Sequence, residues 1–307
     1  MTVPPSLREH TPEAVLRRLE LTIGRRLDGL LQGDYHGLLP GPGSEPDESR
    51  PYQPGDDVRR IDWNVTARTT TTHVRDPIAD RELETWILLD RSPSMDFGTA
   101  RCEKRDLALA AASAVGFLTL RAGNRVGAVV LTQETARRLP ARPGRQGLLA
   151  LLWQLAQSPS AAGGAGTDLA AGIEHLLRPP RRRGLAVVVS DFLSDTAWDR
   201  PLRALVQRHQ VLAIEVVDPR ELELPAVGYL TLVDPETGRT RDVQTARRST
   251  RERYAAAAAQ QRADIAHRLR RAGASHLVLR TDGDWLLDMV RFVLARRRAG
   301  PPARAAR

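Results

Sequence analysis

The chain has 307 residues, a formal net charge of +9 and 41% hydrophobic residues, a composition that is typical of a folded globular protein and excludes wholesale disorder. No apolar run reaches the ~18 residues that a membrane-spanning helix needs, and the N-terminus does not show the pattern of a signal peptide. A single cysteine, Cys102, excludes an internal disulfide, so we expect a cytoplasmic protein without a membrane span.

The basic charge is carried almost entirely by arginine, because Lys104 is the only lysine. Arginines cluster at residues 181–183 and in the C-terminal tail, where a nucleic acid could contact them. Aromatic residues make up only 4% of the chain, and none is interleaved with these arginines as a base-stacking surface requires. Nucleic-acid binding is therefore kept only as a minor alternative.

The first predicted element is a helix from Pro12 to about Leu31, with apolar residues at helical spacing and Thr11 as a candidate N-cap. Two segments rich in proline, glycine or arginine, 40–46 and 179–184, interrupt the chain. The first separates the N-terminal helix from the rest of the chain. The second predicts a loop inside the main domain.

From Leu83 onward, short apolar runs alternate with helical patterns. The predicted strands are residues 85–89, 126–131, 185–189, 211–217 and 276–279. The predicted helices cover residues 107–118, 146–156, 169–177, 201–208 and 251–271, and a last helix is opened by a capping-box pattern at Thr281 and Asp284. Before the helix at 251–271, the segment Pro235-Glu236-Thr237-Gly238 predicts a β-hairpin.

This alternation predicts an α/β domain with a doubly wound, mainly parallel sheet of Rossmann-like type. The right-handed crossover rule places helices on both faces of such a sheet. Ligands of these folds bind at the carboxyl ends of the strands, near the topological switch point. The functional residues are therefore expected in the loops that follow the strands.

Three of these loops carry oxygen donors. Asp90, Ser92 and Ser94 follow the first core strand, Thr167 lies at the start of a helix, and Asp191 ends the strand at 185–189. Carboxylate and hydroxyl oxygens that converge on one point suit a hard divalent cation such as Mg²⁺. A short Asp/Ser loop alone is common turn chemistry, but three such loops in this order favour a metal site.

The combination resembles the metal-ion-dependent adhesion site of von Willebrand factor A domains. The resemblance implies that Asp90, Ser92, Ser94, Thr167 and Asp191 hold Mg²⁺ or Mn²⁺, with the aspartates often acting through water. It also implies that a partner's carboxylate completes the metal's coordination. The neighbouring Asp168 is interpreted as a residue of the first helical turn that interacts favourably with the helix dipole.

An upstream segment resembles the signature of the DUF58 family of bacterial proteins, which joins this motif to a von Willebrand-type domain. From the residues alone, 54–57 predict a turn, and Ile61, Trp63 and Val65 alternate as one face of a strand. An ion-pair network that locks the segment onto the main domain is favoured over a partner-contact surface, and both remain open. The signature residues are Tyr52, Pro54, Gly55, Asp56, Asp57, Arg59, Asp62, Trp63 and Arg68.

The predicted organisation has three parts. Residues 1–80 hold the N-terminal helix and the DUF58 signature as an extension, and residues 81–299 form the von Willebrand factor A-like domain. Residues 300–307 are expected to be a disordered basic tail. Cys102 lies near the start of a helix, which can lower a thiol pKa, but a half-buried and inert thiol is the favoured interpretation.

We expect a non-enzymatic, metal-dependent protein-interaction module whose partner offers a carboxylate to the metal. The family resemblance implies an adaptor or chaperone-like role with a MoxR-type AAA+ ATPase or its client. The alternative is a metal-dependent phosphohydrolase with Asp90 as nucleophile. Phosphohydrolases of the haloacid dehalogenase type need a second carboxylate two positions further on, and that position is Ser92.

Overall fold

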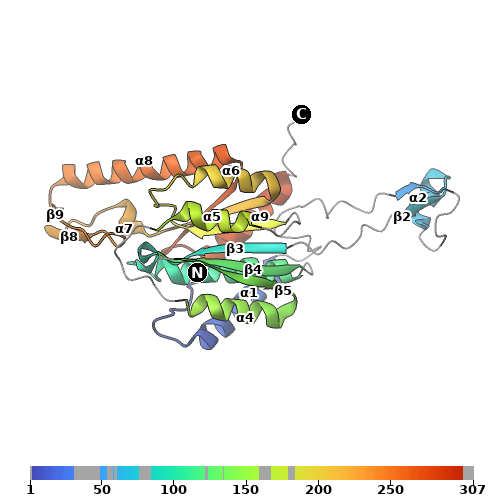
Figure 1. Cartoon of the computed structure of the whole chain (residues 1–307), viewed down its shortest axis with the longest axis horizontal. Coiled ribbons are helices and arrows are strands. Elements are labelled where there is room, and N and C mark those ends of the chain that lie inside the picture. The colour runs from blue at the N-terminus through green and yellow to red at the C-terminus, as the bar shows by residue number, and fades with distance from the viewer. Residues whose placement is uncertain are drawn as a thin grey trace.

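The structure is a computed structural model that describes residues 2–30, 49–53, 58, 61–75, 84–121, 124–133, 135–158, 167–178 and 184–299. Its centre is a sheet of six strands in the order β10-β7-β6-β3-β4-β5 (Figure 1). The strands are β3 (Glu84–Asp90), β4 (Arg125–Leu131), β5 (Ala136–Arg142), β6 (Leu185–Ser190), β7 (Gln210–Val217) and β10 (Ser275–Arg280). All neighbours pair in parallel except β5, which runs antiparallel to β4 at one edge.

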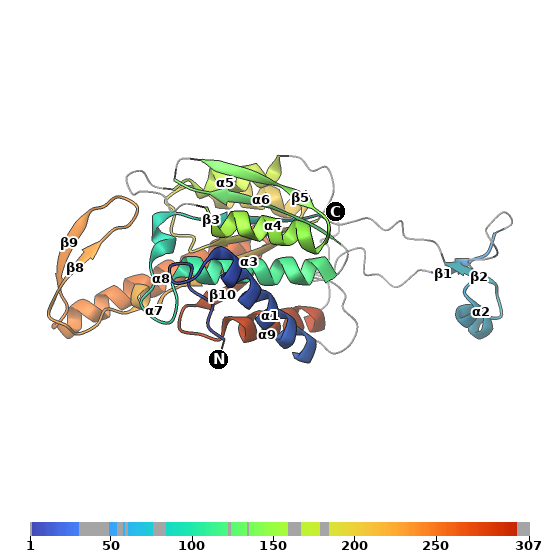
Figure 2. The ribbon, with the colours of Figure 1, turned by 90° about the horizontal axis from the view of Figure 1, so that it is seen from below.

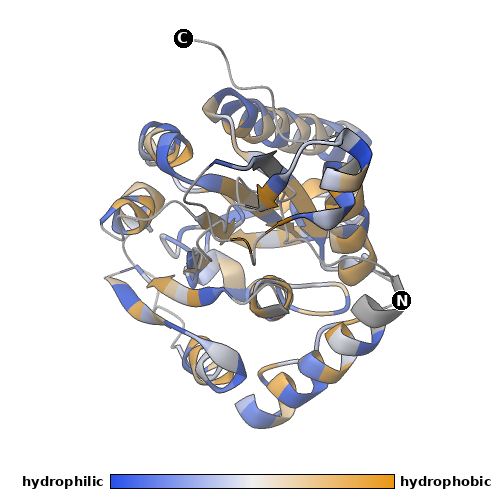
Figure 3. Ribbon diagram, turned by 90° about the vertical axis from the view of Figure 1, so that its right-hand side faces the viewer, coloured by the Kyte–Doolittle hydropathy of each residue, from blue (hydrophilic) through white to orange (hydrophobic). Residues whose placement is uncertain are grey.

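Helices cover both faces of the sheet, as the end-on view in Figure 3 shows. On one face lie α1 (Pro12–Leu30), α3 (Lys104–Arg121), α4 (Gly144–Ala156) and α9 (Trp285–Ala299). On the other face lie α5 (Leu169–Leu177), α6 (Asp199–Arg208) and α8 (Arg248–Ala272). The predicted doubly wound α/β fold is confirmed.

The alternation of side chains along β3 divides the core into two layers. Ile87 and Leu89 face the layer of α3, whereas Trp86 and Leu88 face the layer of α5. A strand that is buried on both faces has a continuous apolar run in its sequence, which explains why these strands could be recognised in the sequence. Among the described residues, no helix is both long and apolar enough to cross a membrane.

The N-terminal helix α1 packs into the same core as the sheet. Val15, Leu19 and Ile23 are buried there, and the Thr11 hydroxyl accepts a hydrogen bond from the backbone N–H of Ala14 at 3.4 Å. The predicted helix and its N-cap are therefore present. The domain boundary proposed at residue 80 stays a prediction.

Residues 49–75 contain a small unit of β1 (Ser49–Pro51), α2 (Trp63–Thr69) and β2 (His73–Arg75), which lies apart from the six-stranded sheet in Figure 1. The strand predicted over Ile61, Trp63 and Val65 is wrong, because α2 begins at Trp63. The Asp62 carboxylate accepts hydrogen bonds from the backbone N–H groups of Asn64 and Val65 and so caps the helix. This local capping outweighs the two-residue alternation of apolar side chains.

The order in which the chain adds strands to the sheet changes direction at β3. It proceeds from β3 to β4 and β5 on one side, and then crosses to β6 on the other side. The carboxyl ends of β3 and β6 therefore border the switch point, where a crevice for ligands forms in α/β sheets. A hairpin of β8 (Tyr229–Val233) and β9 (Thr240–Gln244) follows β7 and the short helix α7 (Pro219–Leu222), as predicted around Pro235 (Figure 2).

Candidate metal-binding site

The five predicted ligands lie in three loops at the switch point, and all five are buried. Asp90 ends β3, and Asp191 directly follows β6. The hydroxyl oxygens of Ser92 and Ser94 are 3.0 Å apart, in and beside the short 3₁₀ helix η2 (Pro93–Asp96). Thr167 precedes α5 and is joined to the Ser94 loop through a shared carboxylate, that of Glu236.

Asp90 is held in a fixed orientation by two hydrogen bonds. Its Oδ1 accepts the backbone N–H of Ser92 at 2.9 Å, and its Oδ2 accepts the hydroxyl of Ser190 at 2.6 Å. The Ser190 hydroxyl in turn accepts the backbone N–H of Phe192 at 3.0 Å. Ser190 therefore orients Asp90 from the neighbouring strand, a role that the sequence patterns did not predict.

The surroundings of Asp90 disfavour the negative charge of its carboxylate. Burial, followed by the negative charge of Asp191, raises the pKa of Asp90 to about 6. Two buried carboxylates this close disfavour each other's ionised form, and a cation between them would relieve the repulsion.

Lys104, the only lysine, supplies one compensating charge. Its fully buried Nζ donates to Asp191 Oδ2 at 2.7 Å and to Glu221 on α7. Burial acts to raise the pKa of Asp191, but the charge and hydrogen bond of Lys104 outweigh it and hold the pKa below its usual value. Burial likewise opposes the charge of Lys104, yet Asp191 and Glu221 raise the pKa of its ammonium group.

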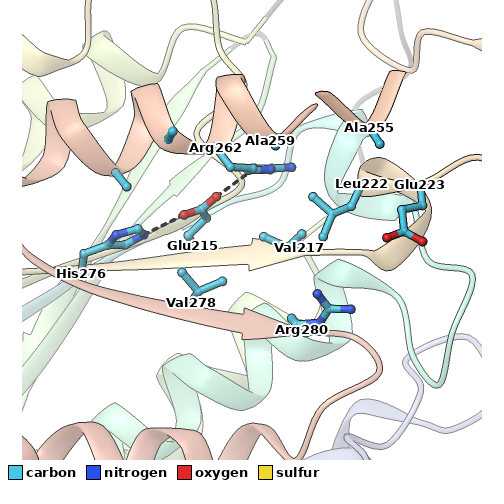
Figure 4. Close-up of a pocket in the computed structure, with 12 residues that line it drawn as sticks. Glu215, Val217, Leu222, Glu223, Ala255, Ala259, Arg262, His276, Val278 and Arg280 are labelled. Atoms are coloured by element: carbon cyan, nitrogen blue, oxygen red, sulfur yellow. Dashed lines mark hydrogen bonds and ion pairs between the residues drawn. The ribbon is translucent and has the colours of Figure 1, made fainter. Parts of the chain in front are cut away.

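The ion-pair network continues beneath α8, where Figure 4 shows its residues lining a hollow against β7 and β10. Arg262 donates to Glu221 Oε2 at 3.1 Å, to Glu215 Oε1 at 3.0 Å and to the backbone oxygen of Asp191 at 2.9 Å. Glu215 also pairs with His276 at 2.7 Å. Arg262 thus also holds the backbone of Asp191.

The donor set fits a small, hard divalent cation. Within the described residues, no group of three or more His, Cys, Asp or Glu side chains could hold a metal ion, so a metal here would have to use hydroxyl ligands. Three hydroxyls and two carboxylates provide the all-oxygen environment that Mg²⁺ prefers. Because Lys104 occupies one oxygen of Asp191, this carboxylate is better placed to act through water than by direct contact.

The other predicted residues have different roles. Asp168 is the N-cap of α5 and accepts the backbone N–H of Ala171 at 3.0 Å. In the signature segment, Trp63 is 70% exposed, and Arg68 donates to the backbone oxygen of Asn64. Tyr52 donates its backbone N–H to Thr72. Residues 54–57 and 59 lie outside the described residues, so the choice between a structural lock and a contact surface stays open.

Cys102 does not have the environment of a reactive thiol. Burial, with the negative charges of Asp106 and Asp218, raises its pKa to about 12. Its thiolate population at pH 8 should therefore be about a thousandfold below that of an ordinary thiol. We expect iodoacetamide to alkylate the folded protein far more slowly than the urea-unfolded protein. Mass spectrometry measures both rates, with Cys102→Ser as the blank, and equal rates would contradict this environment.

The six-stranded sheet defines a doubly wound α/β domain. When the strands of the six-stranded sheet are numbered one to six in chain order, they follow the order 3-2-1-4-5-6 that is typical of doubly wound sheets. The candidate site lies at the switch point of this order. Residues 48–264 match the family described as "Protein of unknown function DUF58", and the chain belongs to this family.

The comparisons also find relatives that match most of this chain. "Uncharacterized protein Rv1480" of Mycobacterium tuberculosis is 58% identical over 285 residues, which cover 93% of this chain and 90% of the relative. Among solved structures, BatB from Bacteroides thetaiotaomicron is 16% identical and covers 70% of this chain and 99% of its own, with a TM-score of 0.43. A "von Willebrand factor type A" structure from Catenulispora acidiphila is 12% identical, with a TM-score of 0.40. The match covers 74% of this chain and 44% of that chain.

Proposed function

We propose that this protein is a non-enzymatic, metal-dependent protein-interaction module. Mg²⁺ or Mn²⁺ would be held by Asp90, Ser92, Ser94, Thr167 and Asp191, and a carboxylate of a protein partner would complete the coordination. The observation that carries the proposal is the convergence of these buried oxygen donors at the switch point of the sheet. A charge-assisted contact of this kind supplies both direction and specificity to a protein interface.

The arrangement of Asp90 favours binding over catalysis. The position two residues on is Ser92, where a phosphohydrolase would need a second carboxylate. A generic phosphate ester provides the check, and turnover that disappears in Asp90→Asn would contradict the non-enzymatic role.

The proposed partner is a MoxR-type AAA+ ATPase or one of its client proteins. This part rests on the resemblance to the DUF58 family, in which an adaptor role beside such ATPases is expected. Co-purification in Mg²⁺ and in EDTA, with wild type and Asp90→Ala, tests it. Capture of the ATPase only by wild type in Mg²⁺ would support the proposal, and equal capture in all four conditions would overturn it.

Thermal unfolding in Mg²⁺, Mn²⁺ and EDTA tests the metal site itself. A metal that binds only the folded state at ~100 times its Kd adds about 2.7 kcal/mol, enough to raise the midpoint by several degrees. We expect this shift in wild type, its loss in Asp90→Ala, and an unchanged shift in Asp264→Ala, which alters an exposed carboxylate on α8. The absence of a shift in wild type would refute the metal site.

A further inference from the structure

The turn of the β8–β9 hairpin is built to present one side chain, that of Glu236. Asp234 organises the turn: its carboxylate accepts the backbone N–H of Glu236 at 3.0 Å and the hydroxyl of Thr237. The backbone of Asp234 also accepts the N–H of Gly238 at 2.8 Å and donates to Arg239 at 2.8 Å. Gly238 adopts a φ of 70°, a left-handed conformation that suits glycine. Glu236 therefore projects from an ordered turn.

The carboxylate of Glu236 is seated in the candidate metal site. Its Oε1 accepts the backbone N–H of Ser94 at 3.1 Å, and its Oε2 accepts the backbone N–H and the hydroxyl of Thr167 at 3.2 and 2.9 Å. Gln133, in the loop after β4, donates to the backbone oxygen of Glu236 at 3.3 Å. Three separate loops thus hold the tip of the hairpin.

Apolar burial does not account for this position. Tyr229 and Val233, at the two ends of β8, are 80% and 59% exposed, and the residues on either side of Glu236 are exposed as well. Glu236 itself is half-buried. The contacts of its carboxylate with the Ser94 and Thr167 loops are therefore the specific link between the hairpin tip and the site.

Glu236 brings a carboxylate to the loops of two candidate ligands, Ser94 and Thr167. Lys104 compensates Asp191 and Glu221 but makes no ion pair with Glu236. A cation held by the hydroxyls of Ser94 and Thr167 would therefore lie within reach of the Glu236 carboxylate, and its charge would favour the ionised form.

We propose that Glu236 is an internal ligand of the metal site, which occupies the position that a partner's carboxylate would take. The inference rests on the proposed function and extends it. In the absence of a partner, the domain's own carboxylate fills the coordination position that the partner would use. A partner then binds by displacing the hairpin. The ligand class that competes with Glu236 is an acidic protein side chain.

The first test is a Mn²⁺ titration in which the electron paramagnetic resonance signal reports free Mn²⁺. The variant Glu236→Gln keeps the shape of the side chain and one acceptor oxygen but removes the charge. We expect its affinity for Mn²⁺ to fall tenfold or more, at least as much as the loss of an outer-shell partner causes. Glu252→Gln, on the exposed part of α8, should bind as wild type does, and Asp90→Ala should not bind.

The second test asks whether the coordination position has opened. Acetate is the probe, and broadening of its methyl NMR signal by bound Mn²⁺ reports its approach to the metal. Acetate should be broadened by Mn²⁺-loaded Glu236→Gln at concentrations at least tenfold below those that wild type needs. The same readout on Glu252→Gln should match wild type.

The outcomes separate this inference from the function on which it rests. Equal Mn²⁺ affinity and equal acetate broadening in wild type and Glu236→Gln, with binding lost in Asp90→Ala, would overturn the role of Glu236 and leave the metal site in place. No Mn²⁺ binding by wild type would overturn the metal site and its internal ligand together.

Discussion

Replacing Lys104 with methionine is expected to reduce the free energy of unfolding of the metal-free protein by about 3 to 5 kcal/mol. The Lys104 side chain is fully buried and bonded to Asp191 and Glu221. Methionine has a similar length but no charge, so both carboxylates would lose their shared cation. Breaking a buried ion pair by removing one partner is costly because the remaining charge is left without compensation in a poorly solvated place.

Urea unfolding in EDTA measures this loss. The matched control is Arg248→Met, which removes an exposed ion pair with Glu252 and should change stability by less than about 1 kcal/mol. Adding Asp191→Asn to Lys104→Met should restore part of the stability, because the stranded charge of Asp191 disappears, whereas Glu221 keeps its ion pair with Arg262. A loss below about 1 kcal/mol in Lys104→Met, or no recovery in the double variant, would show that Lys104 does not act as the counter-charge.

Most of the sheet could be predicted from the sequence because its central strands are buried on both faces. The runs at 85–89 and 185–189 became β3 and β6, and the turn around Pro235 became the β8–β9 hairpin. β5 was not predicted. Its sequence, Ala136–Arg142, is rich in arginine, and only Leu139 is buried at this edge of the sheet, so no apolar run marks it.

Two local signals led to wrong predictions because a sequence pattern does not show which side chain caps a helix. Capping depends on which backbone N–H groups the side chain reaches in the folded protein. Asp62 caps a helix where apolar alternation had predicted a strand. Thr281 was predicted to open the last helix through a capping box with Asp284, but its hydroxyl donates to Asp218 at 2.7 Å. Asp284 alone accepts the backbone N–H of Leu287, at 3.4 Å.

The five candidate ligands could be identified because each lies in a loop whose position follows from the strand or helix beside it. Lys104, Ser190 and Glu236 could not be identified in this way. Lys104 and Asp191 are 87 residues apart in sequence, and Glu236 and Ser94 are 142 apart. No local pattern encodes such contacts. Lys104 is the only lysine, but this did not lead to a prediction of its role or of its partners.

Replacing Asp218 with asparagine is expected to cost about 2 to 4 kcal/mol at pH 7. The buried Asp218 carboxylate joins the end of β7 to two other segments. It accepts the backbone N–H and hydroxyl of Thr99 at 2.9 and 2.6 Å, the hydroxyl of Thr281 at 2.7 Å and the backbone N–H of Arg220 at 2.9 Å. Asparagine would replace one acceptor oxygen with an NH₂ group that faces donors.

The pH dependence of this loss follows from the pKa of Asp218. Burial acts to raise that pKa, but the hydrogen bonds from Thr99, Thr281 and Arg220 outweigh it and hold the pKa below the ordinary value of 3.8. A carboxyl with a lowered folded-state pKa stabilises the fold above its unfolded pKa, and this stabilisation is lost as the pH falls through the folded pKa. The difference between wild type and Asp218→Asn should therefore be constant from pH 7 to about 5 and shrink below about pH 4.

Urea unfolding of both proteins at several pH values measures this difference, with Asp264→Asn, an exposed carboxylate on α8, as the control that should follow wild type throughout. A difference that grows as the pH falls would mean that the folded-state pKa of Asp218 is raised, because the charged form would then be the one that destabilises the fold. The hydrogen bonds from Thr99 and Thr281 would in that case not stabilise the charged carboxylate, and the junction between β7, β10 and the loop after η2 would depend on packing alone.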